Sequence, residues 1–196
     1  MWLVKPLSNN KDSEPKTNYS VLKKWLFLIE IAKSMFKLSK KEKVLFGLVL
    51  IAALTRLVPH PPNFAPITAM SLFCGAYFTR KQLAFIVPLL AMLISDLFLG
   101  FHTISAFVYL SFSVITWMGQ QKNRVTPKLV LLGSILFFFI SNFGVWLLYY
   151  PKSIDGLVTC FMLAIPFFAT SLLGDVIYSI VLVYGFSMAS KRLQLS

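Results

Sequence analysis

The sequence has few charged residues and almost no cysteine. Only 13% of its 196 residues are Asp, Glu, Lys or Arg, seven of them acidic, whereas 57% are apolar. This composition, with a mean hydropathy of +0.74, excludes an ordinary soluble domain and indicates an integral membrane protein. The two cysteines, Cys74 and Cys160, form no CxxC or Cys/His pattern, so we expect buried, reduced thiols rather than disulfides or a zinc site.

Motifs for nucleotide and hydrolytic chemistry are also missing. The chain contains no GxxxxGK[ST] phosphate loop, no GxGxxG, no HExxH and no GxSxG elbow. We therefore expect a protein that is not an enzyme, holds no cofactor or metal, and does not hydrolyse ATP. If the protein transports a molecule, three energy sources stay open: a partner protein, an ion gradient, or neither of them.

The formal charge of +12 does not indicate nucleic-acid binding, because ten of the nineteen Lys and Arg residues fall in the first 43 positions. Residues 1–20 are predicted to be disordered. Residues 21–43 predict a basic amphipathic helix on an anionic leaflet, since Trp25, Leu28, Ala32 and Phe36 share one helical face. A solvated basic tail that only sets orientation is the alternative.

Residues 44–189 predict an all-α, polytopic bundle of about six membrane-spanning helices, since each span needs roughly 20 residues. The predicted spans are 44–58, 64–79, 83–101, 103–119, 129–150 and 167–189. Pro166 interrupts the last apolar stretch, so we expect a short re-entrant or interfacial helix, Leu157 to Ile165, before the final span. Residues 190–196 would be a cytoplasmic tail.

The basic residues of the loops predict the orientation of the bundle. All Lys and Arg residues except Arg56 and Lys152 would lie on one side of these six spans. By the positive-inside rule, both termini are then cytoplasmic.

Polar residues gather toward the opposite, outer side, beginning with the stretch "RLVPHPPNFAP" at residues 56–66. An ionisable side chain in the bilayer costs from ~2.5 kcal/mol upward unless it is paired or hydrated, so we expect these groups to face one outward-opening pocket. The predicted substrate-binding residues are Arg56, His60, Asn63, Asp96, His102, Tyr109, Asn142, Trp146 and Asp175. Alternatively, Arg56 pairs with Asp96 or Asp175 only to hold helices together.

Four blocks carry a resemblance to known proteins: "RLVPHPPNFAPITAMSLFCGAYF", "PLLAMLISDLFLGFH", "SNFGVWLLYYPKSIDGLVTCFMLAIPFF" and "LLGDVIYSIVL". In order and spacing, over about residues 44–189, the chain resembles a family of bacterial inner-membrane proteins classed as a domain of unknown function. More distantly, its size and layout are similar to the S components of energy-coupling factor vitamin transporters, including solitary cobalamin-type members.

This resemblance implies a multi-pass protein of the bacterial cytoplasmic membrane that binds a vitamin-like molecule near the outer face and takes it up. The first span lacks the AxxxA pattern with which S components dock their coupling module, so a solitary mode stays open beside a coupled one. Two other functions also stay open: a membrane scaffold that recruits partners or anionic lipid through residues 21–43, and an intramembrane enzyme that uses Asp96 and Asp175 as a carboxylate pair.

Overall fold

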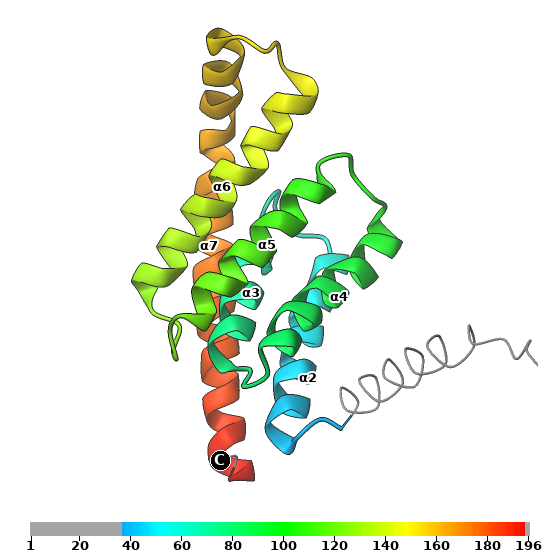
Figure 1. Ribbon diagram of the computed structural model, residues 1–196, viewed down its shortest axis with the longest axis vertical. Coiled ribbons are helices and arrows are strands. Elements are labelled where there is room, and N and C mark those ends of the chain that lie inside the picture. The colour runs from blue at the N-terminus through cyan, green and yellow to red at the C-terminus, as the bar shows by residue number, and fades with distance from the viewer. Residues whose placement is uncertain (1–36, 195–196) are drawn as a thin grey trace, which may run out of the picture. The chain divides into compact units, whose positions relative to one another are not determined.

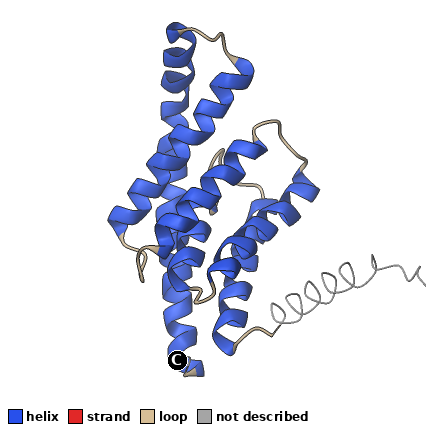
Figure 2. Cartoon of the chain, viewed as in Figure 1, coloured by secondary structure: helices blue, strands red, loops and turns tan. Residues whose placement is uncertain are grey.

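The computed structural model describes residues 37–194, and every regular element in that range is a helix (Figures 1 and 2). The predicted all-α fold is thus confirmed for this part of the chain. The predicted disordered segment 1–20 and most of the predicted amphipathic segment 21–43 lie outside the described residues. The elements are α2 (Lys40–Leu54), the 3-10 turn η1 (Thr55–Leu57), α3 (Ile67–Tyr77), α4 (Lys81–Leu99), α5 (Ser105–Gln120), α6 (Pro127–Tyr149) and α7 (Ile154–Leu193).

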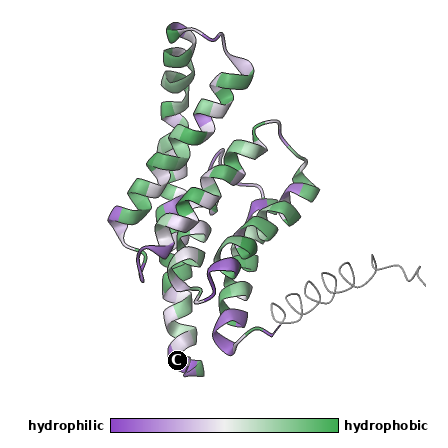
Figure 3. Cartoon of the chain, viewed as in Figure 1, coloured by the Kyte–Doolittle hydropathy of each residue, from purple (hydrophilic) through white to green (hydrophobic). Residues whose placement is uncertain are grey.

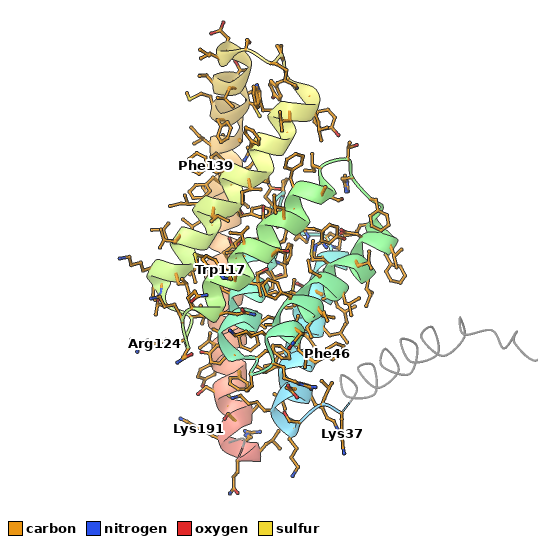
Figure 4. All side chains as sticks on the ribbon, viewed as in Figure 1. Lys37, Phe46, Trp117, Arg124, Phe139 and Lys191 are labelled. Carbon is orange, nitrogen blue, oxygen red and sulfur yellow. The ribbon has the colours of Figure 1, made fainter. Side chains whose placement is uncertain are left out.

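Three of these helices are long and apolar enough to cross a membrane: α4, α6 and α7. The helix α3 is apolar but has only 11 residues, about half of a full crossing. Hydrophilic residues concentrate at helix ends and loops, and hydrophobic ones cover the helix shafts (Figure 3). The side chains of Phe46, Trp117 and Phe139 are exposed on the outside of the helices, as expected for a surface that contacts lipid (Figure 4).

The predicted break at Pro166 is wrong, because α7 runs as one helix of 40 residues through that proline. Proline removes one helical hydrogen bond, whereas ending one helix and starting another would expose many backbone groups. In apolar surroundings the second cost is larger. A separate helix Leu157 to Ile165 therefore does not form, and α7 is about 60 Å long at ~1.5 Å per residue.

Two predicted boundaries also change. The first membrane-domain helix begins at Lys40, inside the range predicted for the amphipathic segment, and the regular α-helix ends at Leu54 rather than at residue 58. At the other end, α7 continues to Leu193 and takes in most of the described part of the predicted tail. Both changes follow from capping, which hydropathy does not detect: Ser39 caps α2, and Gln194 ends α7 in the left-handed conformation.

A capping box and an ion pair fix the start of α2 to the start of α4. The hydroxyl of Ser39 accepts a hydrogen bond from the Glu42 amide, and the Glu42 carboxylate accepts one from the Ser39 amide. Arg80, just before α4, donates from Nε and Nη2 to the two oxygens of Glu42, each at 2.7 Å. These hydrogen bonds from Arg80 lower the pKa of Glu42 to about 2, although the carboxylate is buried.

The helices α3 and α5 approach each other closely at a pair of glycines. A Cβ atom on Gly75 would overlap the carbonyl oxygen of Thr116 and lie 2.9 Å from the Cα of Gly119. A Cβ atom on Gly119 would lie 2.8 Å from the carbonyl oxygen of Leu72. Small residues at a helix crossing let backbones pack directly, which is the usual way to gain packing energy without water. The core of the bundle lies at this crossing.

We expect Gly75→Ala to destabilise the protein by about 1–3 kcal/mol, because its new methyl group has no space against α5. The matched control is Gly47→Ala in α2, where an added Cβ meets nothing within 4 Å. There the substitution should be neutral or stabilising, since alanine favours the helix. Thermal unfolding in detergent measures both, and equal midpoints for the two variants would contradict the close approach of α3 and α5.

The Glu42–Arg80 pair should make stability depend on pH. Because folding lowers the pKa of Glu42 from 4.5 to about 2, its contribution is complete above pH 4.5 and disappears as the pH falls toward 2. At neutral pH, Glu42→Gln should lose roughly 1.5–3 kcal/mol, and the wild type and variant should converge in acid. Unfolding midpoints measured from pH 7 down to the acid limit test this, and a constant difference would argue against the ion pair.

Candidate functional site

A cavity of about 360 Å³ lies between α4, α5, α6, α7 and the loop that precedes α3. We call it the Arg56 cavity. Its polar lining side chains are Arg56, Asn63, Asp96, His102, Ser105, Ser141, Asn142 and Ser171. On α4 and α6 these residues lie toward the C-terminal end, and on α5 and α7 toward the N-terminal end. The cavity therefore lies away from the loops that join α3 to α4 and α5 to α6.

Arg56 is held against one face of α4. Its Nη1 atom is 3.0 Å from Asp96 Oδ1 and 2.9 Å from Met92 Sδ, and it also bonds the hydroxyl of Ser95. These three partners are at helical spacings of three and four, so they form one patch on α4. Within the described residues no partner accepts a hydrogen bond from Nε or Nη2 of Arg56. The guanidinium thus has donors left for a molecule in the cavity.

Asp96 connects Arg56 to α5. Its second oxygen, Oδ2, accepts a hydrogen bond of 2.7 Å from the hydroxyl of Tyr109. With only 6% of its surface exposed, the carboxylate is paired on both oxygens, as a buried charge requires. The Arg56–Asp96–Tyr109 chain therefore joins η1, α4 and α5 beside the cavity.

Several polar groups of the cavity have no partner among the described residues. The side-chain amide of Asn63, the ring of His102 and the hydroxyl of Ser171 make no side-chain hydrogen bond there, while Asn142 uses only Nδ2, bonded to the carbonyl of Phe138. Asn63 also has a φ of 62°, a left-handed backbone conformation that asparagine tolerates better than most residues. These groups can bind water or a polar ligand.

The opposite wall of the cavity is aromatic and aliphatic. It is formed by Phe137 and Phe138 of α6 and by Phe167 and Phe168 of α7, with Val145 and Ala164 beside them. The rings of Phe138 and Phe168 pack with centroids 5.1 Å apart. The residues of this wall were not among the predicted site residues, although the run Phe137–Phe139 next to Ser141 and Asn142 is a visible signal.

Five of the nine predicted site residues line the Arg56 cavity: Arg56, Asn63, Asp96, His102 and Asn142. His60 lines a smaller cavity of about 190 Å³ that shares Arg56, Asn63 and Ser171 with the larger one. Tyr109 does not line the cavity, but its hydroxyl reaches Asp96. The remaining two, Trp146 and Asp175, have other surroundings.

Trp146 lies at the turn between α6 and α7. Its indole N–H donates a 3.0 Å hydrogen bond to the carbonyl of Pro151, and the ammonium group of Lys152 lies 5.7 Å from its ring centroid. These contacts stabilise the α6–α7 turn, and the side chain is not among those that line the cavity.

Asp175 lies one turn beyond Ser171 on α7 and is almost fully buried, with 1% of its surface exposed. Its Oδ2 atom accepts a 2.7 Å hydrogen bond from Ser134 of α6. The hydroxyl of Thr68 and the amides of Thr68 and Ala69 lie beside the carboxylate, although neither Asp175 Oδ1 nor Thr68 Oγ1 has a partner at hydrogen-bond geometry. The carboxylate thus faces the N-terminus of α3, which has no side-chain cap of its own.

Asp175 therefore has a structural role that sequence spacing did not reveal. A carboxyl group at the first turn of α3 places acceptor oxygens beside the free amides at the positive end of the helix dipole. Gly174 lies against the segment that enters α3, since a Cβ atom there would be 3.4 Å from the Ala65 nitrogen. Asp96 and Asp175 have separate hydrogen-bond partners, and only Asp96 lines the cavity.

Residues 36–195 match the model of a family described as "Family of unknown function (DUF6580)". No curated protein and no solved structure matches the chain. The match covers every described helix and all residues of the Arg56 cavity.

Asp175→Ala should destabilise the ligand-free protein by about 1–3 kcal/mol, because the buried hydrogen bond between Ser134 and Asp175 is lost and the first turn of α3 loses the acceptor beside it. Asp155→Ala, at an exposed aspartate of the same helix, is the control and should change stability by less than about 1 kcal/mol. Thermal unfolding without added ligand measures both. A wild-type midpoint for Asp175→Ala would show that the carboxylate does not support α3.

Proposed function

The chain belongs to this family of unknown function, and we propose that it is a multi-pass protein of the bacterial cytoplasmic membrane that takes up a small, vitamin-like molecule bound in the Arg56 cavity. The observation that carries the proposal is the Arg56–Asp96 pair at the edge of a cavity in which Asn63, His102 and Ser171 make no side-chain hydrogen bond among the described residues. A buried ion pair adds little net stability. Asn63 and His102 are exposed and Ser171 is half-buried, so their donors and acceptors are accessible to a ligand that enters the same space.

The chemistry of the two walls supports a ligand with a polar part and an apolar part. The donors of Arg56, Asn63 and His102 suit a carboxylate, phosphate or carbonyl group. The phenylalanine wall suits a ring or a short aliphatic chain. A volume of about 360 Å³ is at the lower end of the usual range for small-molecule sites, ~300–1,000 Å³.

The position of the cavity supports entry from the outer face. With both termini cytoplasmic, the basic loops around Arg80 and Arg124 and the basic last turn of α7 at Lys191 are inside, and the helix ends that hold the cavity are outside. The segment 58–66, which contains four prolines, covers this end and contributes Asn63 and, in the adjoining smaller cavity, His60. Proline restricts the backbone, so this loop is a stiff cover that would move as a unit.

The short helices are compatible with six crossings if the bilayer thins locally or flanking side chains reach the interface. The 3-10 turn η1 and the irregular segment before α3 border the Arg56 cavity, the setting in which non-helical backbone is tolerated at membrane depth. We further propose an S-component-like mode of uptake, either with a coupling module or by the protein alone. A carboxylate-pair enzyme is not favoured, because Asp96 and Asp175 face different partners.

Purified wild-type protein should be stabilised by at least one compound in a panel of water-soluble vitamins. A ligand at a hundred times its Kd raises the free energy of unfolding by about 2.7 kcal/mol. Ser171→Phe should abolish this stabilisation by filling the cavity, and Arg56→Gln should weaken binding roughly 10–100-fold, or about 1.4–2.7 kcal/mol. The measurement is the shift of the unfolding midpoint with ligand concentration.

Val181→Phe is the matched control, because it adds the same ring to an exposed position of α7 that lines none of the cavities described. It should keep the full ligand-induced shift. If no compound stabilises the wild type, or if Ser171→Phe retains the shift, the Arg56 cavity is not the binding site.

A further inference from the structure

An apolar groove of about 590 Å³ lies on the lipid-facing side of α4 and α5. We call it the outer groove. Its lining is aliphatic, with Leu89 and Leu93 from α4 and Leu110 from α5, apart from Tyr109 and Ser113. The hydroxyl of Ser113 donates to the carbonyl of Tyr109 within the helix. The groove therefore presents almost only hydrocarbon, which matches the chemistry of an acyl chain.

The outer groove and the Arg56 cavity lie on two sides of the same pair of helices. On α4, Met92 and Asp96 line the cavity, while Leu89 and Leu93 line the groove. On α5, Ser105 and Val108 line the cavity, while Ala106 and Leu110 line the groove. Only α4 and α5 thus separate the polar cavity from the lipid.

Tyr109 spans this wall. Its side chain lines the outer groove, and its hydroxyl donates the 2.7 Å hydrogen bond to Asp96, which lines the cavity. Among the described residues, the other side-chain hydrogen bond between α4 and α5 joins Gln120 to the Lys81 carbonyl, at the far end of the pair. These two helices, which run beside each other in Figure 1, also pack less closely than α3 with α4, α5 with α6 or α6 with α7.

We propose that Tyr109 is a lateral gate, and that an amphiphile with an anionic head and one apolar chain enters the Arg56 cavity from the bilayer between α4 and α5. The head binds the free donors of Arg56, and the chain lies in the outer groove during entry. The inference rests on the proposed function, because it names the class of molecule and the route for the same cavity.

The hydrogen bonds lost and gained when Tyr109 moves support its role as a gate. Opening the gate exchanges one hydrogen bond, from Tyr109 to Asp96, for hydrogen bonds from Arg56 to the incoming head. Asp96 keeps its bond to Arg56 Nη1 throughout, so no unpaired charge is left in the wall. Rotation of one aromatic side chain is a fast motion that needs no helix to unfold.

The test uses the full protein in phosphatidylcholine vesicles that contain a photoreactive fatty acid with a diazirine on its chain. After illumination, mass spectrometry maps the labelled residues to the outer groove or to the phenylalanine wall of the cavity. In the wild type we expect labels in both places. Tyr109→Ala should raise cavity labelling at least severalfold, because it removes the ring from the wall, while groove labelling persists.

Tyr109→Phe keeps the ring and removes only the hydrogen bond, so it should raise cavity labelling by a smaller factor, about twofold. This variant replaces Tyr109→Ala as the test if the alanine variant does not fold. Leu131→Ala, at an exposed position of α6 outside the cavities described, is the control and should label like the wild type. The matching diazirine alcohol, which lacks the anionic head, should label the groove but not the cavity.

Equal cavity labelling in the wild type and both Tyr109 variants, or labelling confined to the groove in all of them, would overturn the gate. If the vitamin panel still stabilises the protein in that case, the proposed function survives and only the lateral route fails. If instead Tyr109 controls cavity labelling while no vitamin binds, the cavity takes amphiphiles and the vitamin-like ligand is wrong.

Discussion

The ion pair between Arg56 and Asp96 is the constraint on which the arrangement of the cavity depends. A guanidinium at the end of an apolar helix must find a partner, and Asp96 on α4 supplies it at 3.0 Å. Because the carboxylate also accepts from Tyr109, the same pair sets the position of α5. The pair therefore holds three elements together while Nε and Nη2 of Arg56 have no acceptor among the described residues, so a structural role does not exclude the proposed binding role.

A second charged group organises the opposite side of the loop before α3. The short helix α3 starts without a side-chain cap of its own, and Asp175 of α7 lies against its first turn. The loop of residues 58–66 thus runs between two fixed points, Arg56 of η1, which is paired with Asp96 of α4, and the start of α3, which lies beside Asp175. Four prolines and the left-handed Asn63 make that loop stiff. The loop of residues 58–66 is consequently held at one end by the Arg56–Asp96 pair and at the other end by the contact of Asp175 with α3.

Much of this architecture could be read from local patterns. Apolar runs located α2, α3, α4, α5 and α6 to within a few residues, since burial in lipid requires hydrophobic side chains whatever the tertiary fold. Of the polar residues predicted to meet in one pocket, five line the Arg56 cavity: Arg56, Asn63, Asp96, His102 and Asn142. Their role in binding a substrate stays a prediction. Pro166 misled the prediction, because one lost hydrogen bond costs less than two new helix ends in apolar surroundings.

The fold class and the inventory of rare polar groups follow from local sequence, because hydropathy and helical period are properties of neighbouring residues. Which aspartate lines the cavity and which lies at the start of α3 depends on tertiary contacts, since Asp96 and Asp175 have similar apolar neighbours in sequence. The same holds for Trp146, which lies at the α6–α7 turn, and for the glycine crossing of α3 and α5. Each depends on which distant helix comes within contact distance, and the spacing of residues along one helix carries no information about its partner.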